Sequence, residues 1–248
     1  MSKMTLERWA PTPLVCAAAA AGIAMAALAG CSGGAPANIN AVPAAPGATA
    51  ASGLPTAGVN PAATPPVSNY HYVNSQAFFG ENPTLARYFV PFSFDYPATW
   101  RTDPTAGRTP TSELFVRLKH FDASGKWVEE VDVAPTPSTG DAMADQQRLP
   151  QVMQALDAQF ATVPGYRRID EGQTTFGGSQ ALQLRYSLTD QAGRTIFCRS
   201  IELLGFAGTN GVRVDICAAS PGSAVQSIDD LGVKGDLPII VNSFKLGT

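Results

Sequence analysis

A long stretch near the beginning of this chain lacks charge: no Lys, Arg, Asp or Glu occurs between Trp9 and Gly80. The whole chain has 17 basic and 20 acidic residues, a net charge of −3, and no block of like charges. Nucleic-acid binding requires a basic surface, and electrostatic adhesion to anionic lipid requires a cluster of basic residues. The composition therefore argues against both, and we expect no nucleic-acid partner.

Histidine is also scarce, which limits the catalytic and metal chemistry open to the chain. Of the two histidines, His71 falls at the boundary of the predicted folded part, so a histidine-based zinc site lacks ligands. His120 lies near Asp122 in sequence and could act with a serine, as in a hydrolase. The nearest match to a nucleophile elbow, at Ser179, lacks the final glycine and sits in a predicted hairpin. We therefore expect His120 to be a hairpin residue and keep the hydrolase as an alternative.

No other group of residues forms a strong candidate site. Glu130 and Asp132 would point to one face of a strand and Glu129 to the other, but two carboxylates alone make a poor calcium site. We interpret them as a solvated strand face. Trp100 and Trp127 lie in predicted strands or turns, where aromatic residues usually belong to the core. The sequence predicts no catalytic, metal-binding or cofactor-binding residue.

What the chain does contain is a leader with a basic start and an uncharged apolar stretch over residues 14–29. This stretch ends in Leu28-Ala29-Gly30-Cys31, which resembles the lipobox of bacterial lipoproteins, where the signal is cut before the cysteine that carries the lipid. The resemblance implies a signal peptide over residues 1–30 and acylation of Cys31. The alternative is an uncleaved anchor with a free thiol at Cys31, although no basic stop-transfer cluster follows.

A lipid on Cys31 would bind the protein to a membrane outside the cytoplasm, in the cell envelope. The next residue is Ser32 and not the aspartate that resembles an inner-membrane retention signal. We therefore expect the periplasmic face of the outer membrane if two membranes are present, and otherwise the outer face of the plasma membrane. Residues 31–71 are rich in Ala and Pro and predict a disordered linker that spans on the order of 30–40 Å.

Residues 72–248 are long enough for one domain with a sizeable core. Residues 88–97 are aromatic and alternating, with Phe92, Phe94 and Tyr96 on one face, and predict a strand that ends at Pro97. Turn-forming residues at 122–126 and at 177–178 indicate two hairpins. Their strands are expected to span residues 114–118 and 127–133 in one hairpin, and 167–176 and 181–188 in the other.

Helices are expected in two places. In the region 141–160, the residues Val152, Leu156 and Phe160 recur at helical spacing and form one apolar stripe. Pro150 suits the beginning of a helix better than its interior, so we expect the region to be divided there. Near the end of the chain, a short apolar helix from Leu237 precedes a brief last strand from Ser243.

The pairing of two further strands, 194–204 and 211–218, follows from their side chains. A register that places Leu203 opposite Val212 unites the apolar residues of both strands on one face. The same register places two more compatible pairs opposite each other, Glu202 with Arg213 and Cys198 with Cys217. We predict a disulfide between these cysteines, worth about 3 kcal/mol from loop closure. The alternative is that both cysteines remain reduced in a packed face of the sheet.

The order of these elements predicts an α+β fold, an antiparallel sheet with helices packed on its faces. The segment Phe92–Trp100, the central helix, the Gly177-Gly178 hairpin and the terminal Asn242–Leu246 resemble PsbP-like domains and LpqN-type bacterial lipoproteins. The resemblance implies an α/β/α sandwich and a binding or assembly role. No ligand motif transfers with it, so it leaves the partner open.

The sequence therefore favours a membrane-tethered, non-enzymatic module of the cell envelope that binds a protein or supports an assembly. Two alternatives remain from other classes of protein. One is an envelope hydrolase that uses His120 and a serine. The other is a carrier of a small apolar or lipid ligand held between sheet and helix. The identity of the envelope partner is not encoded in any motif that we can identify.

Overall fold

The computed structural model describes residues 68–247. The predicted signal peptide, Cys31 and nearly all of the predicted linker lie outside these residues. The first strand, β1 (Asn69–Val73), begins within the range predicted as linker, so the folded part starts three residues before residue 72. Among the helices of the described part, none is both long enough and apolar enough to cross a membrane.

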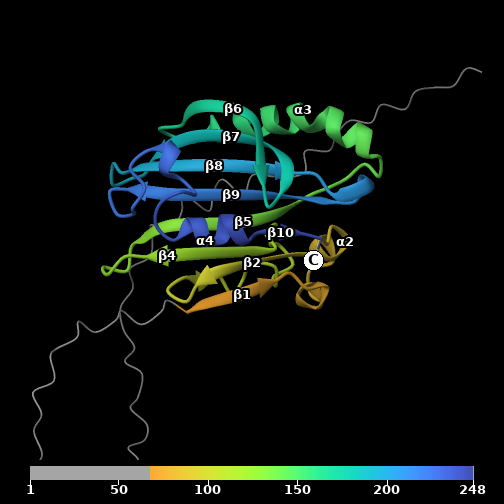
Figure 1. Ribbon diagram of the computed structural model, residues 1–248, viewed down its shortest axis with the longest axis horizontal. Helices are drawn as coiled ribbons and strands as arrows, with labels where there is room; N and C mark the ends of the chain where they lie inside the picture. Colours follow the sequence, from red (N-terminus) through yellow and green to blue (C-terminus); the bar gives the residue numbers. More distant parts are fainter. Residues whose placement is uncertain (1–67, 248) are drawn as a thin grey trace, which may run out of the picture.

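Two antiparallel sheets form the frame of the domain (Figure 1). The large sheet has the strand order β3-β4-β5-β9-β8-β7-β6, and the small one has the order β1-β2-β10. The large sheet consists of β3 (Arg101–Thr102), β4 (Val116–Phe121), β5 (Trp127–Thr136), β6 (Arg167–Phe176), β7 (Ser179–Thr189), β8 (Thr195–Leu203) and β9 (Gly211–Ser220). The small sheet adds β2 (Phe92–Pro97) and β10 (Lys245–Leu246) to β1.

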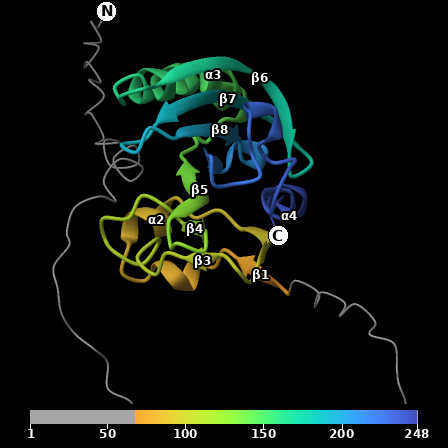
Figure 2. The ribbon, with the colours of Figure 1, turned by 90° about the vertical axis from the view of Figure 1, so that its left-hand side faces the viewer.

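Helical segments cover both sides of the large sheet. The helix α3 packs against β7, whereas α4 packs against β2 on the other side, as Figure 2 shows from the end of the sheet. The α+β fold predicted from the sequence is confirmed. The helical segments are η1 (Gln76–Phe79), α2 (Pro83–Arg87), α3 (Ala142–Phe160), η2 (Phe206–Gly208), η3 (Ile228–Asp230) and α4 (Leu237–Ser243).

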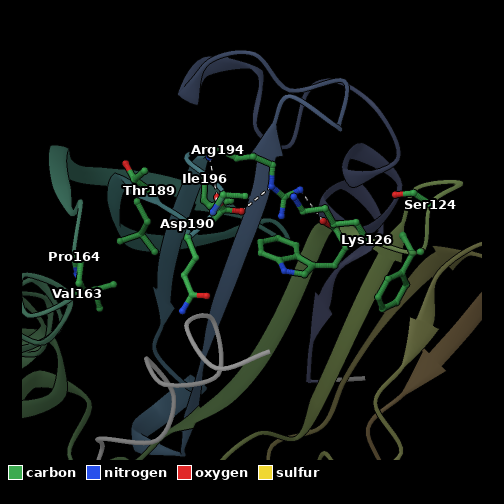
Figure 3. A pocket seen from close by; sticks show the side chains of 14 residues that line it. Ser124, Lys126, Val163, Pro164, Thr189, Asp190, Arg194 and Ile196 are labelled. Atoms are coloured by element: carbon green, nitrogen blue, oxygen red, sulfur yellow. Dashed lines mark hydrogen bonds and ion pairs between the residues drawn. The ribbon is translucent and has the colours of Figure 1, made fainter. Parts of the chain in front are cut away.

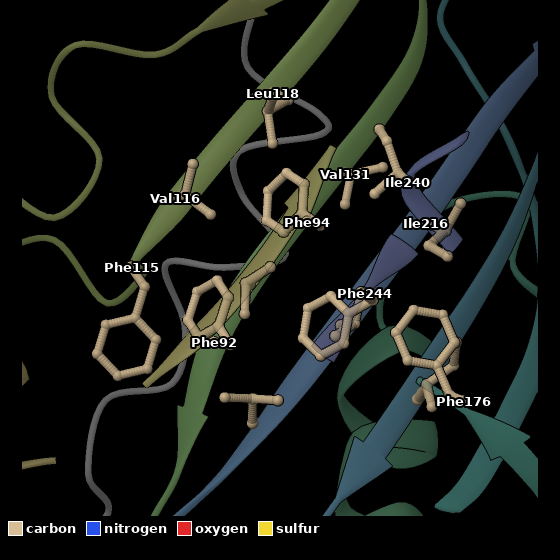
Figure 4. Packing of buried hydrophobic residues seen from close by; sticks show 14 of the residues in the cluster. Phe92, Phe94, Phe115, Val116, Leu118, Val131, Phe176, Ile216, Ile240 and Phe244 are labelled. Atoms are coloured by element: carbon tan, nitrogen blue, oxygen red, sulfur yellow. The ribbon is translucent and has the colours of Figure 1, made fainter. Parts of the chain in front are cut away.

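The larger core lies between the two sheets and is built largely from phenylalanines. Phe92 and Phe94 of β2 stack on Phe244 with ring centroids 5.6 and 6.1 Å apart (Figure 4). Phe244 in turn meets Phe176 at the end of β6. All four rings are almost fully buried, and complete burial of one such side chain is worth roughly 1.5–3 kcal/mol. The alternation of Phe92 and Phe94 thus fixes which face of β2 meets the sheet.

A second, smaller core lies under α3, where Met153, Leu156 and Phe160 pack on residues of β7, β8 and β9. The expectation that Pro150 divides this region was wrong, because α3 runs unbroken from Ala142 to Phe160. The missing N–H of Pro150 leaves the carbonyl of Gln146 without its helical donor, but Gln146 and Pro150 are both exposed, so water can serve that carbonyl. Packing of the apolar stripe offsets the cost of the proline.

The predicted pairing of β8 and β9 is the one the structure shows. Leu203 lies opposite Val212 and Glu202 opposite Arg213. Cys198 and Cys217 also lie opposite each other and form a disulfide. Since successive residues face opposite sides, the same register sends Leu203 to the larger core and Cys198 to the core beneath α3. This pair of strands therefore joins the two cores.

Candidate functional site

His120 does not contact Asp122, the residue with which the hydrolase alternative would pair it. Its Nδ1 lies 2.9 Å from Oε2 of buried Glu129, directly opposite in the β4–β5 register, and its ring stacks on Trp100. Asp122 instead holds its own turn, where its Oδ1 accepts from the backbone N–H groups of Ser124 and Lys126. Burial raises the pKa of Glu129, and the contact with His120 opposes that rise. The geometry is that of a buried carboxylate with a hydrogen-bonded partner.

The acidic residues of β5 are buried, so their interpretation as a solvated face was wrong. Glu130 and Asp132 do converge on one face, but Glu130 is only 4 % exposed. Arg117, opposite Asp132 on β4, reaches both carboxylates: its Nη2 lies 2.6 Å from Asp132 and its Nε 3.1 Å from Glu130. Lys119 adds a further contact to Glu130. A bidentate arginine accounts for the burial, since it neutralises the charge and fills the hydrogen-bonding sites of Asp132.

This charged face continues onto β9 and β8. Arg213 donates to Asp215 at 2.9 Å and lies opposite Glu202, which accepts from the hydroxyl of Thr136 at 2.5 Å. Burial raises the pKa of Glu202 to about 7, against the lowering effect of Arg213. The described residues contain no group of three or more His, Cys, Asp or Glu side chains able to hold a metal ion. Arg117, Lys119 and Arg213 offset most of the negative charge of the four carboxylates on this face.

A concavity lies where several turns meet at one end of the large sheet, and we call it the end pocket (Figure 3). It has a volume of about 760 Å³. Its walls come from the β4–β5 turn, the β7–β8 turn and the segment that follows α3. The apolar lining residues are Phe121, Trp127, Val163, Pro164, Leu188, Ala192 and Ile196, and polar residues such as Lys126, Thr189, Asp190 and Arg194 complete the wall.

An ion pair is fixed in the wall of the end pocket. The Nε of Arg194 lies 2.7 Å from Asp190, its Nη1 donates to the carbonyl of Trp127 at 3.1 Å, and its guanidinium lies over the Trp127 ring. Burial opposes the ionisation of Asp190, but its hydrogen bonds with Arg194 outweigh this and hold the pKa below the usual value. The pair is neutral as a whole, so the wall presents apolar surface together with the one further basic side chain of Lys126 and favours a largely apolar group.

Two turns of the same design build this end of the sheet. One runs from Asp122 to Lys126 and the other from Asp190 to Arg194, each with the pattern Asp-x-x-Gly followed by a basic residue. In both, the aspartate accepts backbone N–H groups and the glycine has a positive φ, 80° at Gly125 and 76° at Gly193. Such turns are rigid because the side chain replaces a backbone turn. The repeated pattern is the sequence signal that our reasoning missed.

The two tryptophans have separate environments. Trp100 is 3 % exposed, belongs to the larger core as predicted, and donates its indole N–H to Asp236 at 3.3 Å. Trp127 is half-buried and lines the end pocket, next to the core beneath α3. The expectation of a core position therefore describes Trp100 fully and Trp127 only in part.

Comparison with known proteins finds similarity in fold. No family model and no curated protein matches the chain. LpqN of Mycobacterium tuberculosis, which is involved in cell envelope biogenesis, is 14 % identical, with 72 % of this chain and 91 % of LpqN covered and a TM-score of 0.44. The PsbP of Synechocystis sp. PCC 6803, CyanoP, is 15 % identical, with 73 % and 93 % covered and a TM-score of 0.42.

A third similar structure comes from a eukaryote. The Ran-binding protein Mog1p of Saccharomyces cerevisiae is 10 % identical, with 73 % of this chain and 96 % of Mog1p covered and a TM-score of 0.40. The resemblance to PsbP-like and LpqN-type proteins expected from the sequence is thus found among solved structures, as a likeness of fold.

Proposed function

We propose that this chain is a non-enzymatic binding module of the cell envelope, tethered to a membrane by lipid on Cys31, and that the end pocket is its binding site. The residues of the lipobox support the tether. The end pocket is the observation that supports the binding role, because it combines a volume of about 760 Å³ with a largely apolar lining, and the Asp190–Arg194 pair in its wall is already satisfied. Such a wall recognises an apolar group by burial and leaves no activated group for catalysis.

The place of the end pocket relative to the tether also supports this role. The chain enters the domain at Asn69, which pairs with Pro97, and the short β3 that follows pairs with the end of β4 next to the Asp122 turn. The end pocket therefore lies at the end of the domain that the linker reaches first.

Carriage of a small apolar or lipid ligand is the second candidate, and the size of the end pocket favours it. A volume of about 760 Å³ falls within the roughly 300–1,000 Å³ typical of sites for small molecules. The ligand would lie at the end of the sheet, beside Val163 and Pro164 in the segment after α3. A protein partner would instead insert an apolar side chain into the same space.

Filling the end pocket tests the binding site. The change Val163→Trp places a large side chain in its wall, and Ala158→Trp, exposed on the outside of α3, is the matched control. We expect the full chain to bind the fluorescent fatty acid cis-parinaric acid saturably, with at least tenfold weaker binding in Val163→Trp and no change in Ala158→Trp. Weak, non-saturable binding in all three proteins, with no adduct in native mass spectra, would refute the carrier function.

Protein binding and anchoring have their own measurements. A photo-crosslinking residue at Gln191, in the rim of the end pocket, should capture a protein from the envelope if a protein is the ligand. Replacement of Cys31 by Ala should release the protein from the membrane fraction and remove the acyl mass from its N-terminal peptide. Recovery of the wild-type protein in the soluble fraction with its leader intact would contradict the tether.

A further inference from the structure

The outward face of α3 carries no charge. Its exposed positions are Ala142, Met143, Gln146, Gln147, Pro150, Gln151, Gln154, Ala155 and Ala158. An exposed helix face usually collects charged residues, whereas depletion of charge is characteristic of the centre of protein–protein interfaces. This face is therefore unusual for a surface that meets only water.

The charged residues of α3 are all engaged on its inner side. Asp145 is buried and accepts from Thr139. Arg148 donates to the carbonyl of Pro137, and Asp157 accepts from Arg168. Because each charge is held against the domain, the outer face keeps its uncharged character whichever rotamers the glutamines adopt.

A phenylalanine protrudes beside this face. Phe206, in the loop between β8 and β9, is 89 % exposed, and Met143 in the first turn of α3 is 69 % exposed. Two hydrogen bonds from Ser138 hold the loop in place. The hydroxyl of Ser138 donates to the carbonyl of Gly208 at 2.6 Å, and the backbone N–H of Ser138 donates to the side chain of Asn210 at 3.0 Å. A fixed loop that presents a phenyl ring to solvent indicates a contact surface.

The loop also holds this ring in a defined direction. Residues 206–209 form a turn that is closed by a hydrogen bond from the N–H of Thr209 to the carbonyl of Phe206 at 3.1 Å. Ala207 and Gly208 have the positive φ values, 52° and 78°, that a turn of this kind requires at its two central positions.

A groove adjoins the protruding phenylalanine. It has a volume of about 530 Å³ and lies between the first half of α3 and the strands β6 and β7. Leu149, Leu182 and Leu204 give it an apolar floor, and Leu204 and Gly205 lead directly into Phe206. Its remaining wall includes the polar side chains of Asp145, Gln146, Gln173 and Gln180. The protruding phenyl ring and a groove with an apolar floor therefore lie side by side on one surface.

We propose that this surface joins two copies of the chain about a two-fold axis, with Phe206 of each copy in the α3 groove of the other. A two-fold interface uses the same patch on both copies, which requires a patch that carries both the knob and its receptor. A second copy also presents the same uncharged face, whereas a charged partner would find no complementary charges here. The dimer does not depend on what the end pocket binds.

The size of the surface sets the expected strength of association. The 19 residues of α3 form a rod about 28 Å long and about 10 Å wide, to which the groove and the loop add their area. The helix alone therefore offers about 280 Å² on each copy, less than the roughly 800 Å² per partner of a standard stable interface. We expect a weak, transient dimer, which confinement of both copies to one membrane would favour.

Cysteine crosslinking of the full chain in the envelope of an expressing cell tests the dimer. In the proposed dimer the axis would pass close to Gln147, the residue next to Gln146 in the groove wall, so Gln147→Cys should meet its own copy. Ala158→Cys is the matched control on the same helix, about 16 Å farther along, and its copies would be about 30 Å apart. Cys198 and Cys217 are buried in their disulfide and will not exchange with the introduced thiols.

We expect a dimer band on a non-reducing gel for Gln147→Cys and none above the wild-type background for Ala158→Cys. Adding Phe206→Asp to Gln147→Cys should reduce the band at least fivefold, whereas adding Val233→Asp, at another position with an exposed apolar side chain, should leave it unchanged. Equal bands at the two cysteines, no band at Gln147→Cys, or insensitivity to Phe206→Asp would each overturn the proposal. A crosslink from Gln147→Cys to a different protein, without the dimer, would also overturn it.

Discussion

The disulfide between Cys198 and Cys217 gives the most quantitative prediction. It joins directly opposed residues of β8 and β9 across a sequence separation of 19. In the loop-entropy description, closing a loop of this length restricts the unfolded chain enough to stabilise the folded state by about 3 kcal/mol. Both cysteines are almost fully buried under α3, so the reduced thiols remain packed as small apolar groups and leave no cavity.

Reduction should therefore lower the free energy of unfolding of residues 68–248 by about 3 kcal/mol, and the melting temperature by roughly 6–12 °C for a domain of this size. Urea unfolding followed by circular dichroism, with and without dithiothreitol, measures the change. The double variant Cys198→Ala/Cys217→Ala should be insensitive to the reductant and at least as unstable as the reduced protein, because removal of two buried sulfur atoms also leaves small cavities. A change below about 0.5 kcal/mol, with reduction verified by mass, would refute the loop-closure explanation.

Two further predictions concern the charged face of the large sheet. Arg117→Met removes the partner of Asp132 and Glu130 and should cost about 3 kcal/mol or more at neutral pH, measured by urea unfolding; Arg117→Lys should recover part of the loss. Burial raises the pKa of both Glu130 and Glu202 to about 7 in the folded state, above the roughly 4.3 of an unfolded glutamate. Between these values the folded state binds more protons, so these groups should make stability fall as pH rises from about 4.5 to 7. Glu202→Gln should flatten this slope, and an unchanged slope would contradict the assignment.

The pairing of β8 with β9 was predictable because one register satisfied three kinds of contact at once. A shift by one residue would have sent Leu203 to the opposite face and separated Cys198 from Cys217, so the sequence excludes it. The strand predicted over residues 88–97 was confirmed only over Phe92–Pro97, where alternating aromatics permit only one buried face; Tyr88 instead caps the end of α2. In both cases the information lies in residues that are close in sequence or directly opposed.

Pro150 and the pair Glu130 and Asp132 show where local reasoning fails. Proline is disfavoured inside a helix by a local clash, but the stripe of Met153, Leu156 and Phe160 packs on strands that follow later in the chain. Likewise, carboxylates in a strand look solvated until Arg117 arrives from the neighbouring strand. Whether a charge is buried depends on such distant partners, which a single sequence does not reveal.

The end pocket was missed for a different reason. Its two turns, at Asp122 and Asp190, follow the same pattern, but each is an ordinary hairpin turn when considered alone. Only the strand order brings them to one end of the sheet, with Trp127 and Arg194 facing each other between them. The repeated turn pattern is thus informative only once both hairpins are known to turn at the same end of the sheet.

The two proposed surfaces lie at opposite ends of the same strands. Trp127 begins β5 at the end pocket, and Thr136 ends it opposite Gly211, beside the loop that carries Phe206. The ten residues of β5 separate the two ends by about 30 Å. Changes so far apart, without shared contacts, should act independently. We expect Phe206→Asp to leave ligand binding unchanged and Val163→Trp to leave the Gln147→Cys crosslink unchanged; coupling between them would mean that the sheet between the two ends transmits a conformational change.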